Sequence, residues 1–229
     1  MSGDLFAAPA VPRIPLAGRD TTFPVHRIYC VGRNFADHAR EMGAPVEHGT
    51  PTIFMKPADA VHLAPALPYP SGTQDLHHEV EMVVALGRDA AGVLKAGEGL
   101  ALVCAYGVGL DLTRRDLQAI AKEKRLPWDV SKGFDASAPV SALRHVDDGG
   151  HPDNAAMWLE INGERRQSTH LSEMIFSVDA VLVYLSTLFR LRAGDLIFMG
   201  TPAGVAALKP GDRYCAVLEG VAELRGHVV

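Results

Sequence analysis

The stretch "LHHEVEMVV", residues 76–84, places two glutamates two positions apart within a pattern typical of a β-strand. Because side chains alternate between the faces of a strand, Glu79 and Glu81 share one face, with Cα atoms about 6.6–7 Å apart. Two carboxylates at this spacing can converge on one divalent cation, which would offset their repulsion. Oxygen-only ligation favours Mg²⁺, Mn²⁺ or Ca²⁺ over Zn²⁺. Taken alone, the pair is more typical of a solvated strand face that carries two unrelated glutamates.

A third carboxylate strengthens the metal hypothesis. Asp111 follows the apolar stretch "AYGVGL" and precedes a predicted helix, a position at which a carboxylate emerges at the rim of a sheet. Asp116, one helical turn further, is interpreted as a solvated helix residue. His77 is interpreted as a structural or supporting group, because histidine would be out of place in an all-oxygen ligand set. The role of His78 stays open.

A histidine and a glutamate follow the stretch "VGRN" at a spacing of three residues. On a short helix His38 and Glu41 would share one face. A carboxylate beside an imidazole orients the ring and raises its basicity, as in a general-base pair. An ordinary surface pair is the more common outcome of this spacing.

Two further polar residues lie in turn-like segments. Lys132 lies in "VSKGFDAS", where Trp128 and Phe134 are close enough in sequence to desolvate part of its side chain, although a lone lysine is usually solvated. Thr201 lies in "MGTPAGV", whose free backbone N–H groups could cradle a carboxylate. The same segment is equally compatible with a simple turn.

The elements that must position these residues are mostly strands. Short Val/Ile/Leu runs separated by Gly and Pro predict a β-rich α+β fold. We predict a strand over 76–86, another ending near Asp111, and a hairpin over 159–167 with its turn at Asn162-Gly163. Short strands are also expected around "RIPL" and "TFPVH". We divide the chain into an N-terminal extension, 1–26, and a catalytic domain, 27–229.

Two longer helices are predicted. The first covers 113–126 and ends before Pro127, with Leu117, Ile120 and Ala121 as its apolar stripe. The second covers 177–191 and begins at the N-cap Ser177. Its predicted apolar stripe consists of Val181, Leu182, Leu185, Leu188 and Phe189.

Composition excludes several classes of protein. The 229 residues are 48% hydrophobic with a net charge of −5 and no basic run, so no nucleic-acid surface is expected. No apolar run reaches the roughly 18–20 residues of a membrane span, and no secretory signal is recognisable, so we expect a cytoplasmic protein. The cysteines Cys30, Cys104 and Cys215 form no CxxC motif and are interpreted as small buried hydrophobic residues.

Many stretches together resemble the fumarylacetoacetate hydrolase family, in particular its short, single-domain bacterial and mitochondrial members. The resemblance covers residues 27–229, with the motifs in family order. They are "YCVGRNFADHAREMG", "PTIFMKPADAV", "LHHEVEMVVALGR", "GVGLDLTRRDLQ", "PWDVSKGFDASAPV", "LEINGERRQ", "SEMIFSVDAVLVYLS" and "GDLIFMGTPAGV". The segment "FPVHRIYCVGRN" is also similar to fumarylpyruvate hydrolases of aromatic-compound catabolism, although this finer match is less specific.

The resemblance implies a mixed β-sandwich roll with a few short helices, usually as a homodimer, and Mg²⁺ as cofactor, with Mn²⁺ or Ca²⁺ as alternatives. The helix of His38 would be a lid, with a hinge around 43–51. The implied metal ligands are Glu79, Glu81 and Asp111, the implied catalytic residues are His38, Glu41 and Lys132, and the implied substrate contacts are Arg115, Gln118 and Thr201.

The implied reaction is hydrolysis of the carbon–carbon bond of an acylpyruvate, such as fumarylpyruvate, to pyruvate and a carboxylic acid. Water activated by His38 and Glu41 would attack the distal carbonyl, and pyruvate would leave as an enolate held by the metal. Oxaloacetate decarboxylation is the main alternative, since it needs the same enolate without activated water. Isomerisation or hydration of related oxo acids, and non-catalytic binding of a dicarboxylate, are further alternatives. The acyl group is not predicted.

Overall fold

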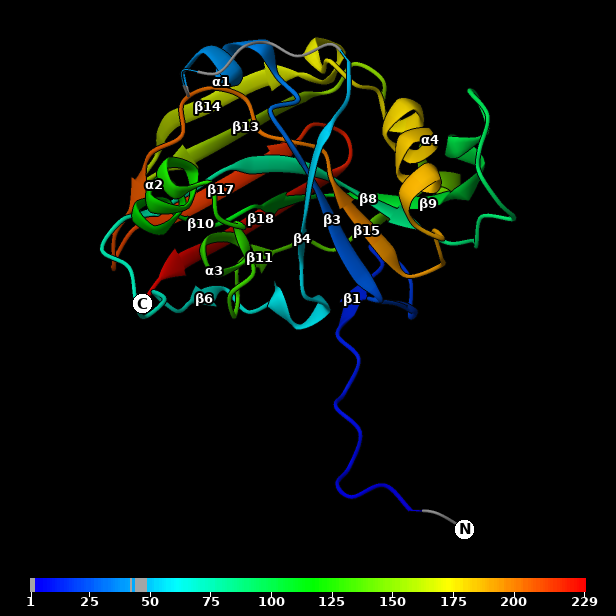
Figure 1. The fold of residues 1–229 in the computed structure, drawn as a ribbon, viewed down its shortest axis with the longest axis horizontal. Coiled ribbons are helices and arrows are strands. Elements are labelled where there is room, and N and C mark those ends of the chain that lie inside the picture. The colour runs from blue at the N-terminus through cyan, green and yellow to red at the C-terminus, as the bar shows by residue number, and fades with distance from the viewer. Residues whose placement is uncertain (1–2, 42, 44–48) are drawn as a thin grey trace.

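The computed structural model describes residues 3–41, 43 and 49–229 and is built around two β-sheets (Figure 1). The larger sheet has the strand order β12-β9-β8-β15-β3-β4, so that β8 and β15 lie at its centre. Its strands are β3 (Arg27–Gly32), β4 (Thr52–Lys56), β8 (Val80–Leu86), β9 (Val103–Leu110), β12 (Arg144–His145) and β15 (Asp195–Phe198).

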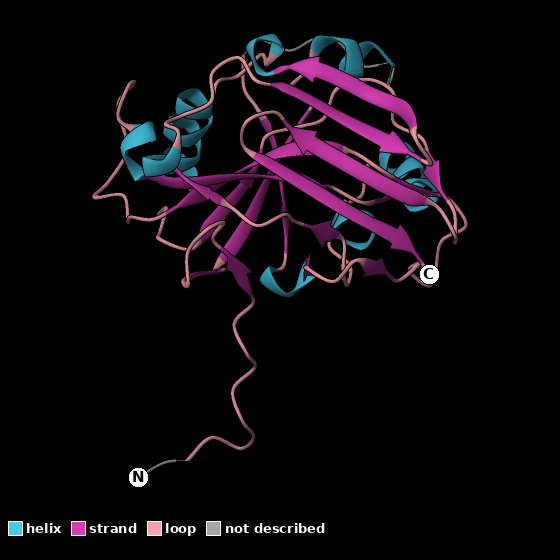
Figure 2. Ribbon diagram, turned by 180° about the vertical axis from the view of Figure 1, so that it is seen from behind, coloured by secondary structure: helices cyan, strands magenta, loops and turns pink. Residues whose placement is uncertain are grey.

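The second sheet has five strands in the order β14-β13-β17-β18-β6, and its long strands lie side by side in Figure 2. They are β6 (Ala66–Leu67), β13 (Ala156–Ile161), β14 (Glu164–His170), β17 (Arg213–Leu218) and β18 (Ala222–Val228). The main apolar core joins the two sheets, with Met82 and Val84 of β8 packed in one cluster with Met157 of β13 and Ala216 of β17. The fold is therefore the predicted β-rich sandwich roll.

Shorter strands close the edges of the fold. They are β1 (Arg13–Pro15) with β2 (Thr22–Pro24), β5 (Val61–His62) with β11 (Ala138–Pro139), and β7 (Leu76–His77) with β10 (Thr113–Arg114) and β16 (Ala207–Leu208). The predicted N-terminal strands are confirmed as β1 and β2. Ile14 and Phe23 of this hairpin pack with Val83, Ala85 and Phe198 in a second apolar cluster, so β8 is covered on both faces. Residues 3–12 lead away from the folded body (Figure 1).

The predicted continuous strand over 76–86 is wrong in one respect. It is divided into β7 and β8 at His78 and Glu79, because β7 pairs with β10 and β16 whereas β8 pairs with β9 and β15. The alternation along β8 is as predicted, since Val80, Met82 and Val84 all enter the main core. The hairpin of β13 and β14 is also confirmed, with Asn162 and Gly163 in the left-handed region at φ 55° and 83°.

Four α-helices accompany the sheets in the described part of the chain. They are α1 (Ala36–Glu41), α2 (Arg115–Lys124), α3 (Asp129–Lys132) and α4 (Val178–Leu188), with 3-10 turns η1 (Ala58–Ala60), η2 (Gly99–Leu102), η3 (Val146–Asp148) and η4 (Leu171–Glu173). Ser177 caps α4 as predicted, and its hydroxyl accepts a hydrogen bond from Ala180 N. The predicted end of this helix is wrong, since Leu188 is exposed and Phe189 is already extended.

The predicted apolar stripe of α2 is confirmed at Ala121 and wrong at Ile120. Ile120 is 45% exposed, whereas Gln118 and Ala121 are buried. The buried face of α2 is therefore partly polar, which indicates that it faces something other than an apolar core.

None of the helices among the described residues is long and apolar enough to cross a membrane. The hinge predicted around 43–51 lies largely outside the described residues.

Candidate active site

The three predicted metal ligands lie together at one end of the central strands. Glu79 immediately precedes β8, Glu81 lies on it, and Asp111 immediately follows β9. Antiparallel pairing matches Val80 with Leu110, so Asp111 lies opposite Glu79, and Asp111 N donates to Glu79 O at 2.8 Å. One carboxylate oxygen of each residue lies within 4.8 Å of those of the other two. All three side chains are buried, which rules out the solvated strand face.

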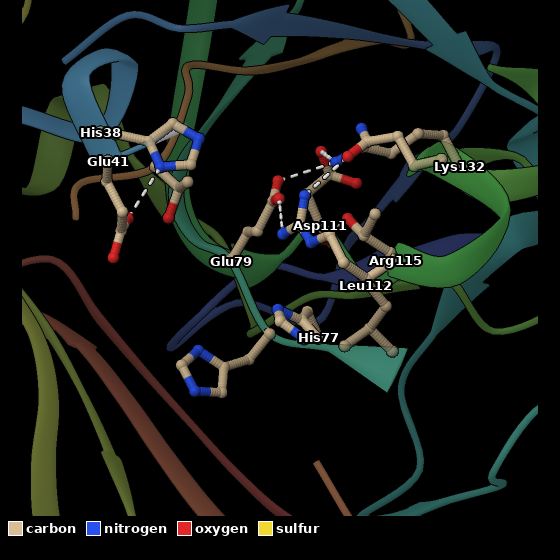
Figure 3. Close-up of polar contacts among 12 residues, drawn as sticks. His38, Glu41, His77, Glu79, Asp111, Leu112, Arg115 and Lys132 are labelled. Carbon is tan, nitrogen blue, oxygen red and sulfur yellow. Dashed lines mark hydrogen bonds and ion pairs between the residues drawn. The ribbon is translucent and has the colours of Figure 1, made fainter. Parts of the chain in front are cut away.

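Three cations surround the carboxylates, and Figure 3 shows two of them, Lys132 and Arg115, beside Glu79. Lys132 Nζ lies 2.7 Å from Glu79 Oε2 and 2.6 Å from Asp111 Oδ2, and Arg115 donates to Glu79 Oε1 at 2.6 Å. Lys56 Nζ lies 2.9 Å from Asp111 Oδ1 and donates to Leu112 O at 3.2 Å. Lys132 is thus buried against the carboxylates of Glu79 and Asp111, in addition to any shielding by aromatic neighbours. Lys56 was not predicted.

The carboxylates differ in electrostatic environment. Burial alone would raise the pKa of Glu79, but Lys132 and Arg115 outweigh it and hold that pKa well below its usual value. The pKa of Glu81 is raised well above its usual value by burial and by the charges of Asp111 and Glu79. Glu81 Oε2 accepts a hydrogen bond from Gly200 N at 2.7 Å. Glu81 therefore carries most of the repulsion within the triad.

The residues fit a hard divalent cation. Their donor atoms are all carboxylate oxygens that converge within one site, as Mg²⁺ or Mn²⁺ prefers. Asp111 Oδ1 is buried and accepts no hydrogen bond among the described residues, because the approach of Lys56 is that of an ion pair without hydrogen-bond geometry. A cation at the triad would also relieve the repulsion that raises the pKa of Glu81.

The predicted pair of His38 and Glu41 lies on α1, across Glu79 from the lysine side of the site (Figure 3). His38 Nδ1 is 3.4 Å from Glu41 Oε2. Both oxygens of Glu41 accept from Gly204 N, at 3.0 and 3.2 Å, which ties α1 to the loop after β15. Burial lowers the pKa of His38, against the raising effects of Glu79 and Glu41, so the imidazole is neutral near pH 7.

The predicted substrate contacts are close to the carboxylates. Arg115 and Gln118 lie on α2, and Arg115 donates to Gln118 Oε1 at 2.7 Å. Thr201 Oγ1 accepts a hydrogen bond from Gln167 Nε2 at 2.7 Å. Thr201 is thus part of a buried network as well as of the pocket wall.

Eight of the nine predicted site residues line a single pocket, and Glu41 lies behind His38. The eight are His38, Glu79, Glu81, Asp111, Arg115, Gln118, Lys132 and Thr201. Asp116 does not line the pocket; it accepts from Thr73 Oγ1 at 2.7 Å and Gln74 N at 3.0 Å, and so anchors the start of α2. Asp116 is a partly exposed helix residue, in line with its interpretation, and has this structural role in addition.

The two histidines beside the triad have structural partners. His77 Nε2 lies 2.9 Å from Asp75 Oδ1. His78 Nδ1 lies 2.9 Å from Gln167 Oε1, which also accepts from Val80 N. Gln167 therefore links the break before β8 to Thr201, a role that its place in the hairpin "LEINGERRQ" does not signal.

Asn34 is a second residue that sequence reasoning missed. Its side chain donates to Met199 O at 2.8 Å and to Phe176 O at 3.1 Å, and accepts from Phe176 N at 2.7 Å. It fixes the start of the His38 segment against β15. The only sequence signal is its position between Gly32 and the histidine.

The chain is similar to several known proteins. Residues 27–229 match the family model described as fumarylacetoacetate (FAA) hydrolase C-terminal. The chain is 42% identical over 202 residues to the mitochondrial oxaloacetate tautomerase FAHD1 of Bos taurus, with 86% of this chain and 89% of that protein covered. It is 38% identical over 200 residues to the oxaloacetate tautomerase YcgM of Escherichia coli, with coverages of 86% and 90%.

Among solved structures, the fumarylpyruvate hydrolase of Pseudomonas aeruginosa in complex with Mn²⁺ and pyruvate superposes with a TM-score of 0.95 at 44% identity. The alignment covers 99% of each chain. With the family model matched over most of the chain, and with relatives this similar over nearly their whole length, this protein belongs to the fumarylacetoacetate hydrolase family.

Proposed function

We propose that this protein is a metal-dependent hydrolase that cleaves the carbon–carbon bond of an acylpyruvate to give pyruvate and a carboxylic acid. The observation that carries the proposal is that a neutral histidine with a carboxylate behind it faces the same pocket as a triad of buried carboxylates. Hydrolysis needs an activated water as well as a site for the oxo acid. Enolate chemistry alone needs no such water.

The charges of the pocket support a dianionic reacting group. The carboxylates of Glu79, Glu81 and Asp111 are matched in number by the cations Lys56, Arg115 and Lys132. A divalent cation would leave two positive charges in excess. The carboxylate and developing enolate of a pyruvate unit would supply two negative charges.

A divalent cation held by Glu79, Glu81 and Asp111 would act as a Lewis acid on the 2-oxo acid and stabilise the charge that develops on departing pyruvate. Lys132 and Arg115 would orient the carboxylate end of the substrate. His38 would remove a proton from water at Nε2, while Glu41 accepts a hydrogen bond from Nδ1–H and so fixes the tautomer. The 3.4 Å separation in this pair would shorten as the substrate draws α1 inward.

Several finer features belong to the same proposal. We assign Mg²⁺ as the physiological metal, with Mn²⁺ as an effective substitute because the Pseudomonas aeruginosa relative binds it. We also propose a cytoplasmic homodimer that acts in the catabolism of aromatic compounds, with residues 27–229 as the catalytic domain.

Oxaloacetate tautomerisation is the second candidate, because curated relatives of about 40% identity carry that name. It falls within the isomerase alternative expected from the sequence. The same triad would bind oxaloacetate, and His38 would move a proton between carbon and the enol oxygen without water. Oxaloacetate decarboxylation would use the same carboxylate triad to bind the substrate.

The test is a steady-state comparison of fumarylpyruvate, acetylpyruvate, fumarylacetoacetate and oxaloacetate with the Mg²⁺-loaded protein. We expect the highest kcat/KM for an acylpyruvate, complete loss with chelator, and recovery with Mg²⁺ or Mn²⁺. His38→Ala should reduce hydrolysis by about 10²–10⁴-fold, and decarboxylation of oxaloacetate far less. Full activity in chelator contradicts the metal role, and a kcat/KM for enol–keto conversion above that of every acylpyruvate favours the second candidate.

A further inference from the structure

The polar face of α2 continues past the residues that contact the carboxylate site. Arg115, Gln118 and Lys122 are spaced by three and four positions, so they follow one another along one side of the helix. All three line the active-site pocket. At a rise of about 1.5 Å per residue, Lys122 lies roughly 10 Å along the helix axis from Arg115.

Arg33 lines the same pocket from a different element. It lies between β3 and the buried Asn34, and its backbone has φ 60° in the left-handed region, which is unfavourable for a residue with a side chain. The neighbours on both sides are held: Gly32 pairs with Thr52 of β4, and the side chain of Asn34 is hydrogen-bonded to Met199 O. The fold thus holds Arg33 in a costly conformation, a feature that is concentrated at functional sites.

These two cations lie in a positive field. Burial lowers the pKa of Lys122, and Arg115 and Arg33 lower it further through their charges. Within the described part of the chain, no carboxylate forms an ion pair with Arg33 or Lys122. Glu79, whose charge acts on Lys122, is already paired with Lys132 and Arg115. Two close positive charges without a counterion favour an anion between them.

Aromatic side chains line the space between the metal end and this cationic end. The rings of Phe54 and Trp128 also line the pocket, with centroids 5.7 Å apart, and Lys122 Nζ lies 5.7 Å from the Trp128 centroid. A flat, apolar wall that ends in two cations is complementary to an unsaturated acyl chain that ends in a carboxylate.

We propose that Arg33 and Lys122 form a subsite for the distal carboxylate of the substrate, so that the preferred substrates are long oxo diacids. This inference rests on the proposed function and deepens it by specifying the acyl group. The site would hold the 2-oxo acid end at the carboxylate triad and the second carboxylate at the end of the pocket.

Length separates the candidate substrates. A seven-carbon oxo diacid spans about 7–8 Å between its terminal carbons, from C–C bonds of about 1.5 Å. That is comparable with the separation of Arg115 and Lys122 along α2. Oxaloacetate, with four carbons, is too short to reach both ends. Arg33 and Lys122 should therefore matter for long diacids and not for oxaloacetate.

The test compares two ligands of equal length that differ only in the distal group, 2-oxoheptanedioate and 2-oxoheptanoate, by calorimetric titration of the Mn²⁺-loaded protein. We expect the diacid to bind at least about tenfold more tightly, the range of a charge-assisted hydrogen bond. Arg33→Gln and Lys122→Gln should each remove most of this preference by weakening the diacid alone. Lys122→Arg should keep it. Lys124→Gln, an exposed lysine on the same helix, serves as the matched control.

Equal affinity of the wild-type protein for the two ligands would overturn the proposal, as would variants that weaken both ligands equally. Turnover distinguishes this result from the fate of the proposed function. If the wild-type protein prefers the diacid but cleaves no acylpyruvate, the subsite is supported and the hydrolase assignment fails. Where fumarylpyruvate is cleaved, Lys122→Gln should raise its KM more than it lowers kcat.

Discussion

At the scale of single residues, two glutamates of the same strand segment have opposite electrostatic roles. Glu79 pairs with Lys132 and Arg115, and its pKa is held low. Glu81, two positions on, is buried beside two other carboxylates, and its pKa is raised. The sequence alone predicts that the two glutamates share one face. It does not reveal the cationic partners of Glu79, which lie 36 and 53 positions further along the chain.

The lowered pKa of His38 leads to a prediction for the pH profile. In the proposed mechanism neutral His38 is the base, so activity should be present above its pKa and be lost as the pH falls through it. Because burial lowers this pKa below 6.5, the acid limb of kcat/KM should have its midpoint below pH 6.5. Glu41→Gln should move the midpoint lower still, since the carboxylate of Glu41 raises the pKa, and should reduce the plateau because the base is weaker.

The measurement is the kcat/KM of an acylpyruvate with saturating Mg²⁺ between about pH 5 and 8. His38→Ala provides the control, because its residual activity should lack this limb. A midpoint above 6.5, or a limb that Glu41→Gln leaves in place, would contradict the assignment of the limb to His38.

At the scale of elements, α1 is tied to the loop after β15 by one backbone group. Gly204 N donates to both oxygens of Glu41, and Gly204 has φ 98°. A Cβ at this position would lie 2.1 Å from Arg166 O, so the loop must shift to accept any other residue. The same glycine therefore sets the position of the helix that carries His38.

We predict that Gly204→Ala lowers kcat/KM by at least about tenfold. The shift of the loop would displace α1, and a small displacement of the proposed general base His38 is costly for catalysis. Amide hydrogen exchange over α1 should become faster, since the helix loses its link to the loop. Gly211→Ala is the matched control: its φ is 93°, yet a Cβ there has open space. Loss of activity in both variants would show that left-handed strain, rather than the Glu41 contact, is responsible.

Elements also show where sequence reasoning succeeds and fails. Strand alternation placed Val80, Met82 and Val84 correctly, because the core face of a strand follows directly from its period. The stripe predicted for α2 is wrong at Ile120, because the buried face of the helix meets the pocket and therefore includes the polar Gln118. Lys56 was missed because a lysine at the end of "TIFMK" is ordinarily solvated, and only the tertiary fold brings it to Asp111.

At the scale of the whole molecule, the carboxylate site lies between two apolar clusters. The N-terminal hairpin covers one face of β8 and the five-stranded sheet covers the other, so the triad is removed from water at the end of a strand buried on both faces. The overall architecture was predictable from the run of short strands and the family motifs. The packing of the hairpin was not, because a Pro-rich segment such as "VPRIPLAGRD" gives little indication of what it covers.

This placement makes the stability of the whole protein depend on the metal. A ligand that binds the folded state stabilises it by about 2.7 kcal/mol at 100 times its dissociation constant. For a chain of this size that corresponds to a rise in Tm of roughly 5–10 °C. Mg²⁺ or Mn²⁺ should produce this rise in the wild-type protein, and chelator should reverse it.

The two glutamates should then respond oppositely when the metal is absent. Glu79→Gln leaves Lys132 and Arg115 short of a counterion and should destabilise the metal-free protein by about 3 kcal/mol. Glu81→Gln removes repulsion and keeps an oxygen for the Gly200 N–H, so the metal-free variant should be at least as stable as the wild type. With metal present, Glu81→Gln should be less stable than the wild type. The variant should bind Mn²⁺ more weakly and therefore lose the increase in Tm. Thermal unfolding of the three proteins with chelator and with Mn²⁺ measures both effects. A metal-free Glu81→Gln protein that is as unstable as Glu79→Gln would show that the burial of each carboxylate, rather than its pairing, determines the response.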